Sequence, residues 1–323
     1  MSYNLPRRAF VFTALAALST PWCAAAADAW TDKPVRIVVP YSAGGSADAI
    51  ARRLAERLKE TTGMRIVVEN ITGGGSIVGT QAVARGSPDG TSLLLTGNGT
   101  LTVSKHVNPN LPLDPEKDLR AVTGINTLPH WIVVRSDRPE KTFDQFIETI
   151  RRQPGKVNIS VNAVAGTAHL ALASWAKANG IDFTIVPYRG SSAAMVDLLG
   201  GATTAHVDVV GSSLQFVKAG KAKALTLLQQ ELIAELPEVP AASRGLLVDS
   251  WLVLATPART PDAIVERIYR AVARIGTEPE FRQYIQSLGF QVWTPNPAET
   301  QNIIAQESRK YRQMVANTGI RTN

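Results

Sequence analysis

The chain has 323 residues, of which 45% are apolar and 19% are charged, and its formal net charge is +7. This composition excludes a disordered chain, and the length suits two domains better than one. The Lys and Arg residues are scattered without a run of five or six, which excludes a nucleic-acid stripe. The positive charge fits either a solvated basic surface or the attraction of an anionic solute.

The first 29 residues have the three-part layout of a secretory signal peptide. Arg7 and Arg8 give a positive start, residues 9–18 are apolar, and small residues occupy 24–29. The apolar stretch is well short of the roughly 20 residues that cross a bilayer, so we expect cleavage rather than a permanent anchor. We predict export to the periplasm by the general secretory route or, given the paired arginines, by the twin-arginine route.

Cys23 is the only cysteine of the chain, and it lies inside this predicted signal peptide. The bulky Trp22 before it disfavours a lipid anchor. The mature chain is therefore expected to have no disulfide, no thiol catalysis and no thiolate metal site. An exported protein without disulfides suits a bacterial periplasm.

The first half of the mature chain alternates strands, glycine loops and helices. Residues 35–39 are a β-branched run typical of a buried parallel strand, and an amphipathic helix that ends at Gly63 follows. Residues 65–68 predict a second strand, a glycine loop at 73–76 opens a second helix, and 92–95 predict a third strand. This alternation indicates βαβ units on a parallel sheet.

The pattern starts again after a stretch rich in Pro and Asp at 108–117. The predicted strands are 131–134, 157–161, 183–186, 205–210 and 222–227, and the predicted helices are 143–152, 167–178, 193–199, 213–219, 261–275, 279–288 and 297–315. We therefore expect an α/β fold of two lobes, each with a mainly parallel sheet flanked by helices. We assign 1–29 to the signal peptide, 30–124 plus 253–323 to lobe 1, and 125–252 to lobe 2.

In open α/β sheets, ligands bind beyond the carboxyl ends of the strands. The first such end carries a candidate ligand loop formed by Tyr41, Ser42, Ala43, Gly44, Gly45 and Ser46. Its paired glycines let backbone N–H groups approach a ligand, and the helix that follows adds partial positive charge, so a carboxylate or phosphate is the expected guest. Asp48 either caps the helix amides or accepts from an amino or hydroxyl group of the ligand. A Gly-Gly turn before a helix is also common without any ligand.

A second loop, from Asn70 to Ser76, lies one βα unit later and offers similar chemistry, with Gly75 and Ser76 as its candidate residues. Neither loop has the Gly-Lys-Ser/Thr of a phosphate-binding loop, and the glycine spacing of a dinucleotide fingerprint is missing. We therefore expect no nucleotide or other cofactor.

The second lobe repeats the arrangement with the candidates Asn162, Gly166, Thr167 and Ala168. His169, in the first turn of the following helix, is either a structural or a catalytic histidine. Asp208 is either a buried aspartate that bonds nearby amides or a ligand contact. The four histidines are isolated in sequence, so no metal site is expected. No serine sits in a Gly-x-Ser-x-Gly elbow, so acyl transfer has no motif support.

The sequence resembles a known family, the periplasmic solute-binding receptors of tripartite tricarboxylate transporters. The resemblance depends on the order and spacing of several segments through nearly the whole mature chain. These segments are PVRIVVPYSAGGSAD (34–48), VVEN (67–70), SPDGTSLLLTGNGT (87–100), LPLDPEKDL (111–119), GTAHLAL (166–172), IVPYRG (185–190), MVDLLGG (195–201), HVDVV (206–210) and FVKAGKAKAL (216–225).

The resemblance implies a two-lobed periplasmic-binding-protein (Venus-flytrap) fold, in which Asp48 and the loop 41–46 face the loop 162–167 across a cleft. It also implies a small carboxylate ligand: a di- or tricarboxylate, an acidic amino acid or an aromatic acid. The implied partners are the large and small membrane subunits of a secondary transporter, and a monomer is the expected state. Three departures from the family pattern stand out, at Ser42-Ala43, at Ile71-Thr72 and at 229–231, the last of which we expect near the hinge or rim.

Two other functions compete with a transport receptor. One is a ligand-sensing module for a membrane sensor kinase, which the sequence does not separate from transport. The other is a periplasmic enzyme of the same fold, with His169 and Asp208 as acid and base, but the chain offers it no nucleophile, metal cluster or cofactor motif. We therefore expect a receptor and not an enzyme.

Overall fold

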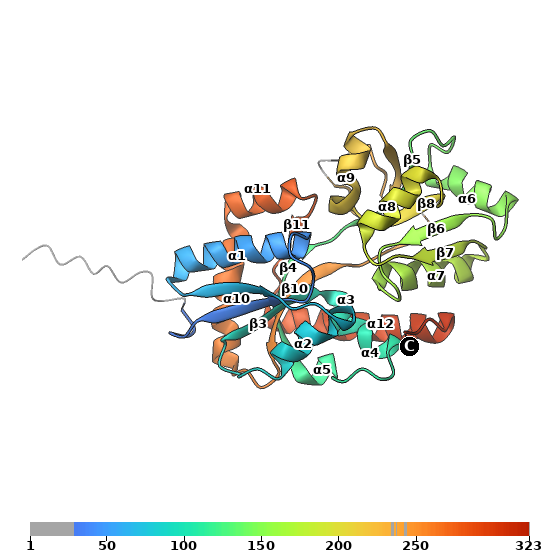
Figure 1. Ribbon diagram of the computed structural model, residues 1–323. Coiled ribbons are helices and arrows are strands. Elements are labelled where there is room, and N and C mark those ends of the chain that lie inside the picture. Colours follow the sequence, from blue (N-terminus) through green and yellow to red (C-terminus); the bar gives the residue numbers. More distant parts are fainter. Residues whose placement is uncertain (1–28, 234–235, 237, 242–243, 323) are drawn as a thin grey trace, which may run out of the picture.

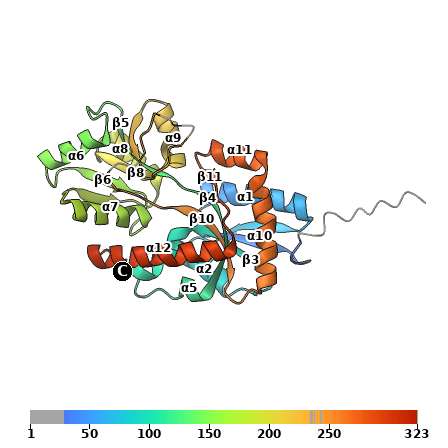
Figure 2. The same cartoon turned by 180° about the vertical axis from the view of Figure 1, so that it is seen from behind.

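The computed structural model describes residues 29–233, 236, 238–241 and 244–322. The predicted signal peptide, with Cys23, falls outside the described residues except for Ala29. The described residues form two lobes, each built on one sheet, which lie next to each other in Figures 1 and 2. The expected α/β class and two-lobed fold are confirmed.

In lobe 1, the described strands form a six-stranded sheet with the order β11-β4-β10-β3-β1-β2. These strands are β1 (Val35–Val39), β2 (Ile66–Asn70), β3 (Ser92–Gly97), β4 (Leu119–Thr127), β10 (Trp251–Pro257) and β11 (Gln291–Val292). The longer helices are α1 (Ser46–Thr62), α2 (Ile77–Ala84), α10 (Asp262–Thr277), α11 (Pro279–Ser287) and α12 (Pro297–Thr318), and the short ones are η1 (Gly74–Ser76), α3 (Asn98–Thr102), α4 (Ser104–Val107) and α5 (Pro115–Asp118).

Alternation along the strands gives lobe 1 a core on each face of its sheet. Ile37 and Val39 belong to the core under α1, α10 and α11, whereas Val38 belongs to the core under α2 and α12. The buried side chains of Ile50 and Leu54 recur at helical spacing along α1, as the sequence predicts. Gly63, with φ of +70°, ends that helix in the left-handed conformation that glycine tolerates.

In lobe 2, the described strands form a five-stranded sheet with the order β7-β6-β8-β5-β9. Its strands are β5 (His130–Arg135), β6 (Asn158–Val161), β7 (Thr184–Pro187), β8 (Ala205–Val209) and β9 (Ala222–Leu227). Helices α6 (Phe143–Arg152) and α7 (Thr167–Asn179) share one core, and α8 (Ser191–Gly200) and α9 (Val210–Lys218) share the core on the other face.

The sheets are mixed rather than mainly parallel, which corrects one detail of the sequence prediction. β1 pairs in parallel with β2 and β3, and β6 with β7 and β8, but β10 and β5 run antiparallel to their neighbours. The reason is that β5 and β10 each enter their sheet from the other lobe. They start at the edge where the parallel strands end, which we call the junction edge of each sheet.

Two segments of the chain cross between the lobes, at 128–129 and at 248–250, and they hydrogen-bond to each other. Leu128 N donates to Ser250 O at 2.7 Å. β4 continues to Thr127 and β10 begins at Trp251, both in the sheet of lobe 1. We therefore propose these crossings as the lobe limits, a few residues from the predicted limits at 124/125 and 252/253.

The lobes also touch through side chains. Ala165 and Leu170 of lobe 2 share a buried cluster with Val103, Tyr311 and Val315 of lobe 1. Figures 1 and 2 both show the C-terminal part of α12 next to α7. Helix α12 therefore supports both lobes. Within the part of the chain that the structure describes, no helix is long and apolar enough to cross a membrane.

Candidate functional site

The predicted ligand loop of lobe 1 lies where β1 meets α1, at the junction edge. Ser42, Ala43, Gly44, Gly45 and Ser46 are all exposed. Gly44 has φ of +83°, which favours glycine, and Gly45 starts α1 in an extended conformation. The backbone N–H groups of the first turn of α1 are therefore presented at an open surface.

The buried side chain of Asp48 stabilises the conformation of this loop. Its side chain is 4% exposed, and its carboxylate accepts from Gly44 N at 2.9 Å, Arg52 Nε at 3.0 Å and Asn70 Nδ2 at 3.0 Å. Burial raises the pKa of Asp48, but the hydrogen bonds from Arg52, Gly44 and Asn70 lower it by more. Because the loop, α1 and β2 each supply one of these donors, the geometry favours support of the loop over direct contact with a ligand. The sequence placed Asn70 at the start of the second loop but did not predict its contact with Asp48, and it assigned Arg52 no role in the site.

A chain of hydroxyl groups connects the loops of lobe 1. Tyr41 Oη lies 3.0 Å from Thr96 Oγ1, which lies 2.8 Å from Thr100 Oγ1, which in turn lies 3.1 Å from Ser76 Oγ. Tyr41 Oη also accepts from Gly97 N at 2.9 Å. The predicted residues Tyr41 and Ser76 are thus brought together through two threonines that the sequence did not single out. Gly75, with φ of +63°, precedes Ser76 in the turn that opens α2.

In lobe 2, the predicted loop lies where β6 meets α7. Thr167 Oγ1 lies 2.8 Å from Ser250 Oγ of the crossing segment, so Thr167 connects α7 to the junction between the lobes. Ala168 is buried, whereas Asn162 and Gly166 are half-buried. His169 Nδ1 accepts from Ala165 N at 3.0 Å, and burial lowers the pKa of His169. A neutral histidine that supports the strained loop residue Ala165, at φ of +50°, fits the structural interpretation of His169.

Asp208 lies at the end of β8, completely buried. Its Oδ1 accepts from Ser191 Oγ at 2.5 Å and lies 3.6 Å from His206 Nε2. A ligand at the junction edge would meet Ser191 before Asp208. Ser191, the first residue of α8, was missed because the sequence predicted that helix from residue 193.

Three of the helices that start at the junction edges lack a capping side chain. Among the described residues, no side chain accepts from the first-turn amides of α1, α7 or α8. Elsewhere α5, α6 and α12 are capped by Asp114, Thr142 and Asn296, whereas α10 and α11 have no side-chain cap either. The first-turn N–H groups of α1, α7 and α8 are therefore left for a ligand or water, and helix N-termini favour an anion.

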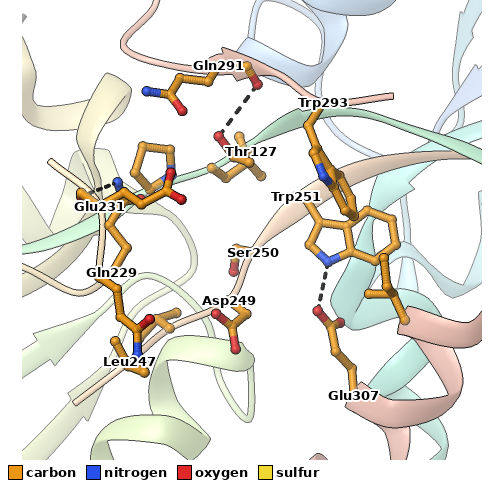
Figure 3. A pocket seen from close by; sticks show the side chains of 15 residues that line it. Thr127, Gln229, Glu231, Leu247, Asp249, Ser250, Trp251, Gln291, Trp293 and Glu307 are labelled. Atoms are coloured by element: carbon orange, nitrogen blue, oxygen red, sulfur yellow. Dashed lines mark hydrogen bonds between the residues drawn. The ribbon is translucent and has the colours of Figure 1, made fainter. Parts of the chain in front are cut away.

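A separate hollow of about 470 Å³ lies between the lobes beside the crossing segments (Figure 3). None of the fourteen predicted ligand residues lines it. Its described lining includes Glu231, Asp249 and Glu307 but no Lys or Arg, and Lys310, which lies outside the lining, is paired with Asp249 at 2.6 Å. The lining therefore offers a carboxylate ligand no cationic side chain. Figure 3 shows Trp251 and Trp293 together on one side, with Glu307 accepting from Trp251 Nε1 at 2.9 Å. Residues 229–231 line this hollow, as expected for a segment near the hinge.

The predicted residues thus fall into one group on each lobe. Thr167 of the lobe 2 group lies close to α3 of lobe 1, where an added Cβ at Gly99 would lie 3.4 Å from Thr167 Cγ2. In the described part of the chain, no three His, Cys, Asp or Glu side chains gather in a way that could hold a metal ion. Two α/β lobes joined by two crossings, with helix N-termini at the junction edges, define the class of periplasmic binding proteins.

Comparison with known proteins identifies the family. Residues 50–320 match the model of the tripartite tricarboxylate transporter family receptor (TctC), and the chain belongs to this family. It is 32% identical to the "UPF0065 protein in the TAR-I ttuE-ttuC' intergenic region" of Agrobacterium vitis, over 87% of this chain and 82% of that one. It is 28% identical to the protein BugT of Bordetella pertussis, over 96% and 95% of the two chains.

Solved structures agree with this family. The chain superposes on a periplasmic transporter with a TM-score of 0.80 at 30% identity, covering 91% of this chain and 99% of that one. The periplasmic binding protein BugD gives 0.77 at 28% identity, with 91% and 100% covered. MatC from Rhodopseudomonas palustris, solved with bound malate, gives 0.75 at 25% identity, with 87% and 98% covered. The resemblance that the sequence motifs indicated is confirmed.

Proposed function

We propose that this chain is a periplasmic receptor that binds a small carboxylate between its lobes and delivers it to a membrane transporter. The observation that carries the proposal is the set of uncapped N-termini of α1, α7 and α8 at the junction edges. Carboxylates are recognised well by such amides, since the hydrogen bonds are charge-assisted and the helix dipole adds to them. The malate found in MatC is a ligand of this class.

The proposed binding residues are those of the two facing groups. They are Tyr41, Ser42, Ala43, Gly44, Gly45, Ser46, Gly75, Ser76, Asn162, Gly166, Thr167 and Ala168, with Asp48 and Asp208 beneath them. Ligand binding would shift the lobes toward a closed arrangement, because only that arrangement lets both groups contact one small molecule. The acidic hollow beside the crossings is not the proposed carboxylate site.

The proposal includes export, partners and the absence of catalysis. Residues 1–29 would direct the chain to the periplasm and be removed there. The closed form would dock, as a monomer, on the large and small membrane subunits of the transporter; a sensor kinase is the alternative partner. His169 supports its own loop and Asp208 is buried, so neither is placed as an exposed acid or base.

A thermal-shift screen of the chain from residue 30 tests the proposal. The panel contains malate, succinate, citrate, glutamate and benzoate, with glucose and choline as neutral and cationic controls. A ligand at 100 times its dissociation constant stabilises the folded state by about 2.7 kcal/mol, which raises the melting temperature by about 5 °C for a chain of this size. Stabilisation by at least one acid and by neither control is expected. Stabilisation by glucose or choline alone would contradict it.

A further inference from the structure

Ser191 carries a hydroxyl group at the junction edge, beside the proposed ligand loop of lobe 2. It is half-buried, and the two residues that follow it in α8 are exposed. Gly190 N donates to Asn162 O at 2.9 Å, which fixes the start of α8 against the β6–α7 loop. An added Cβ at Gly190 would meet no atom within 4 Å, so the space next to Ser191 is open. A ligand held by the first-turn amides of α8 would lie within reach of this hydroxyl.

The Ser191 hydroxyl donates its proton in a hydrogen bond to Asp208. The two oxygens are 2.5 Å apart, and an ionised carboxylate can only accept, so Ser191 is the donor. Asp208 is completely buried, and its Oδ2 is left without a hydrogen-bond partner among the described groups. Burial raises the pKa of Asp208, while His206, Ser191 and Ser213 lower it by more. Burial also lowers the pKa of the nearby His130 to about 4, so His130 is neutral. Because the net effect on Asp208 is a lowered pKa, Asp208 is a carboxylate at neutral pH.

Because its proton points inward, Ser191 Oγ presents only lone pairs to the junction edge. The first turn of α8 thus combines N–H donors with one acceptor, and that acceptor is backed by a buried negative charge. A carboxylate fits the donors but would be repelled at Ser191 Oγ. A hydroxyl or ammonium group on the neighbouring carbon of the ligand fits the acceptor.

We propose that the Ser191–Asp208 pair makes the receptor select carboxylates that carry a hydroxyl or amino group next to the carboxylate, over the same acids without that group. Ser191 is the contact, and Asp208 is a positioning residue that fixes the direction of its proton. This inference rests on the proposed function. It extends that function by naming the chemical class of the ligand.

Calorimetric titration with matched acids tests the inference. Each pair differs by one polar group: malate and succinate, aspartate and succinate, lactate and propionate, mandelate and phenylacetate. For wild type, the member with the hydroxyl or amino group should bind about tenfold tighter, the loss expected when a charge-linked acceptor has no donor. Ser191→Ala should remove this difference by weakening the substituted acid while leaving the plain acid unchanged. Ser191→Thr, which keeps the hydroxyl, should restore the preference.

Ser192→Ala is the matched control, since Ser192 is the next residue of α8, is exposed, and should change neither affinity. Equal binding of both members of every pair by wild type would overturn the inference and leave the proposed function standing. An equal loss for both members in Ser191→Ala would overturn it in the same way. If no acid of any pair bound wild type, the proposed function itself would fail.

Discussion

Replacing Gly45 with valine should abolish carboxylate binding while leaving the fold intact. Gly45 has φ of −78° and ψ of 169°, an extended conformation that any residue adopts. The nearest heavy atom to an added Cβ is Ser42 O, at 3.5 Å, which is an ordinary contact. The valine side chain would therefore stand over the first-turn amides of α1 without strain in the backbone.

The size of each effect follows from these contacts. The free energy of unfolding should change by less than about 1 kcal/mol, because reduced freedom of the unfolded chain offsets the poorer helix cap. Each charge-assisted hydrogen bond to a carboxylate contributes about 1.5 to 3 kcal/mol. Loss of two such bonds should weaken binding by at least about 100-fold.

Urea unfolding measures the first effect, and calorimetric titration with the best acid of the thermal-shift panel measures the second. Gly200→Val is the matched control, because an added Cβ at Gly200, at the far end of α8, meets no heavy atom within 4 Å. That variant should bind like wild type. Normal carboxylate affinity in a folded Gly45→Val protein would refute the assignment of the β1–α1 loop.

Three further predictions concern stability. Asp48→Asn should lower the free energy of unfolding at pH 7 by about 1 to 3 kcal/mol; since the folded-state pKa of Asp48 is depressed, urea unfolding should show this difference vanish as the pH falls through that pKa. Burial raises the pKa of Glu307 to about 7, so the folded state holds a proton that the unfolded state loses above about pH 4.3, and stability should fall on the order of 3 kcal/mol between pH 4.3 and pH 8. Glu307→Gln should flatten this slope in urea titrations. Asn296→Ala removes the bond that the Asn296 side chain accepts from Glu299 N at the start of α12, whereas the reciprocal bond is donated by the backbone N–H of residue 296 and stays. The change should cost about 1 kcal/mol without changing carboxylate affinity; an unchanged melting temperature would contradict this.

Elements with a complete local pattern could be predicted from the sequence. Helix α6 has the predicted bounds 143–152 and strand β9 the predicted bounds 222–227, because each has a clear hydrophobic period. β10 was missed although all of Trp251–Pro257 is buried, since an isolated apolar run does not reveal whether it is a strand. Its antiparallel direction depends on the chain crossing between lobes, which no local pattern encodes.

The loops of the candidate site could be located from the sequence, but the hydrogen bonds that hold them could not. Paired glycines before a helix indicated the loop at Gly44, and their chemistry is visible in sequence. The support of Asp48 by Asn70, 22 residues away, and of Ser191 by Asp208, 17 residues away, depends on how strands pair. Such partners become visible only when the sheet is assembled.

The most direct test of where the ligand binds is a titration of isotope-labelled protein with the best carboxylate, followed by amide and indole NMR signals. We expect the largest shifts at the backbone amides of Gly45, Ser46, Thr167 and Ala168. The indole N–H signals of Trp251 and Trp293, which line the separate hollow, should stay in place. Large shifts of these two indole signals, with the amides of the α1 and α7 N-termini unmoved, would contradict the proposed site.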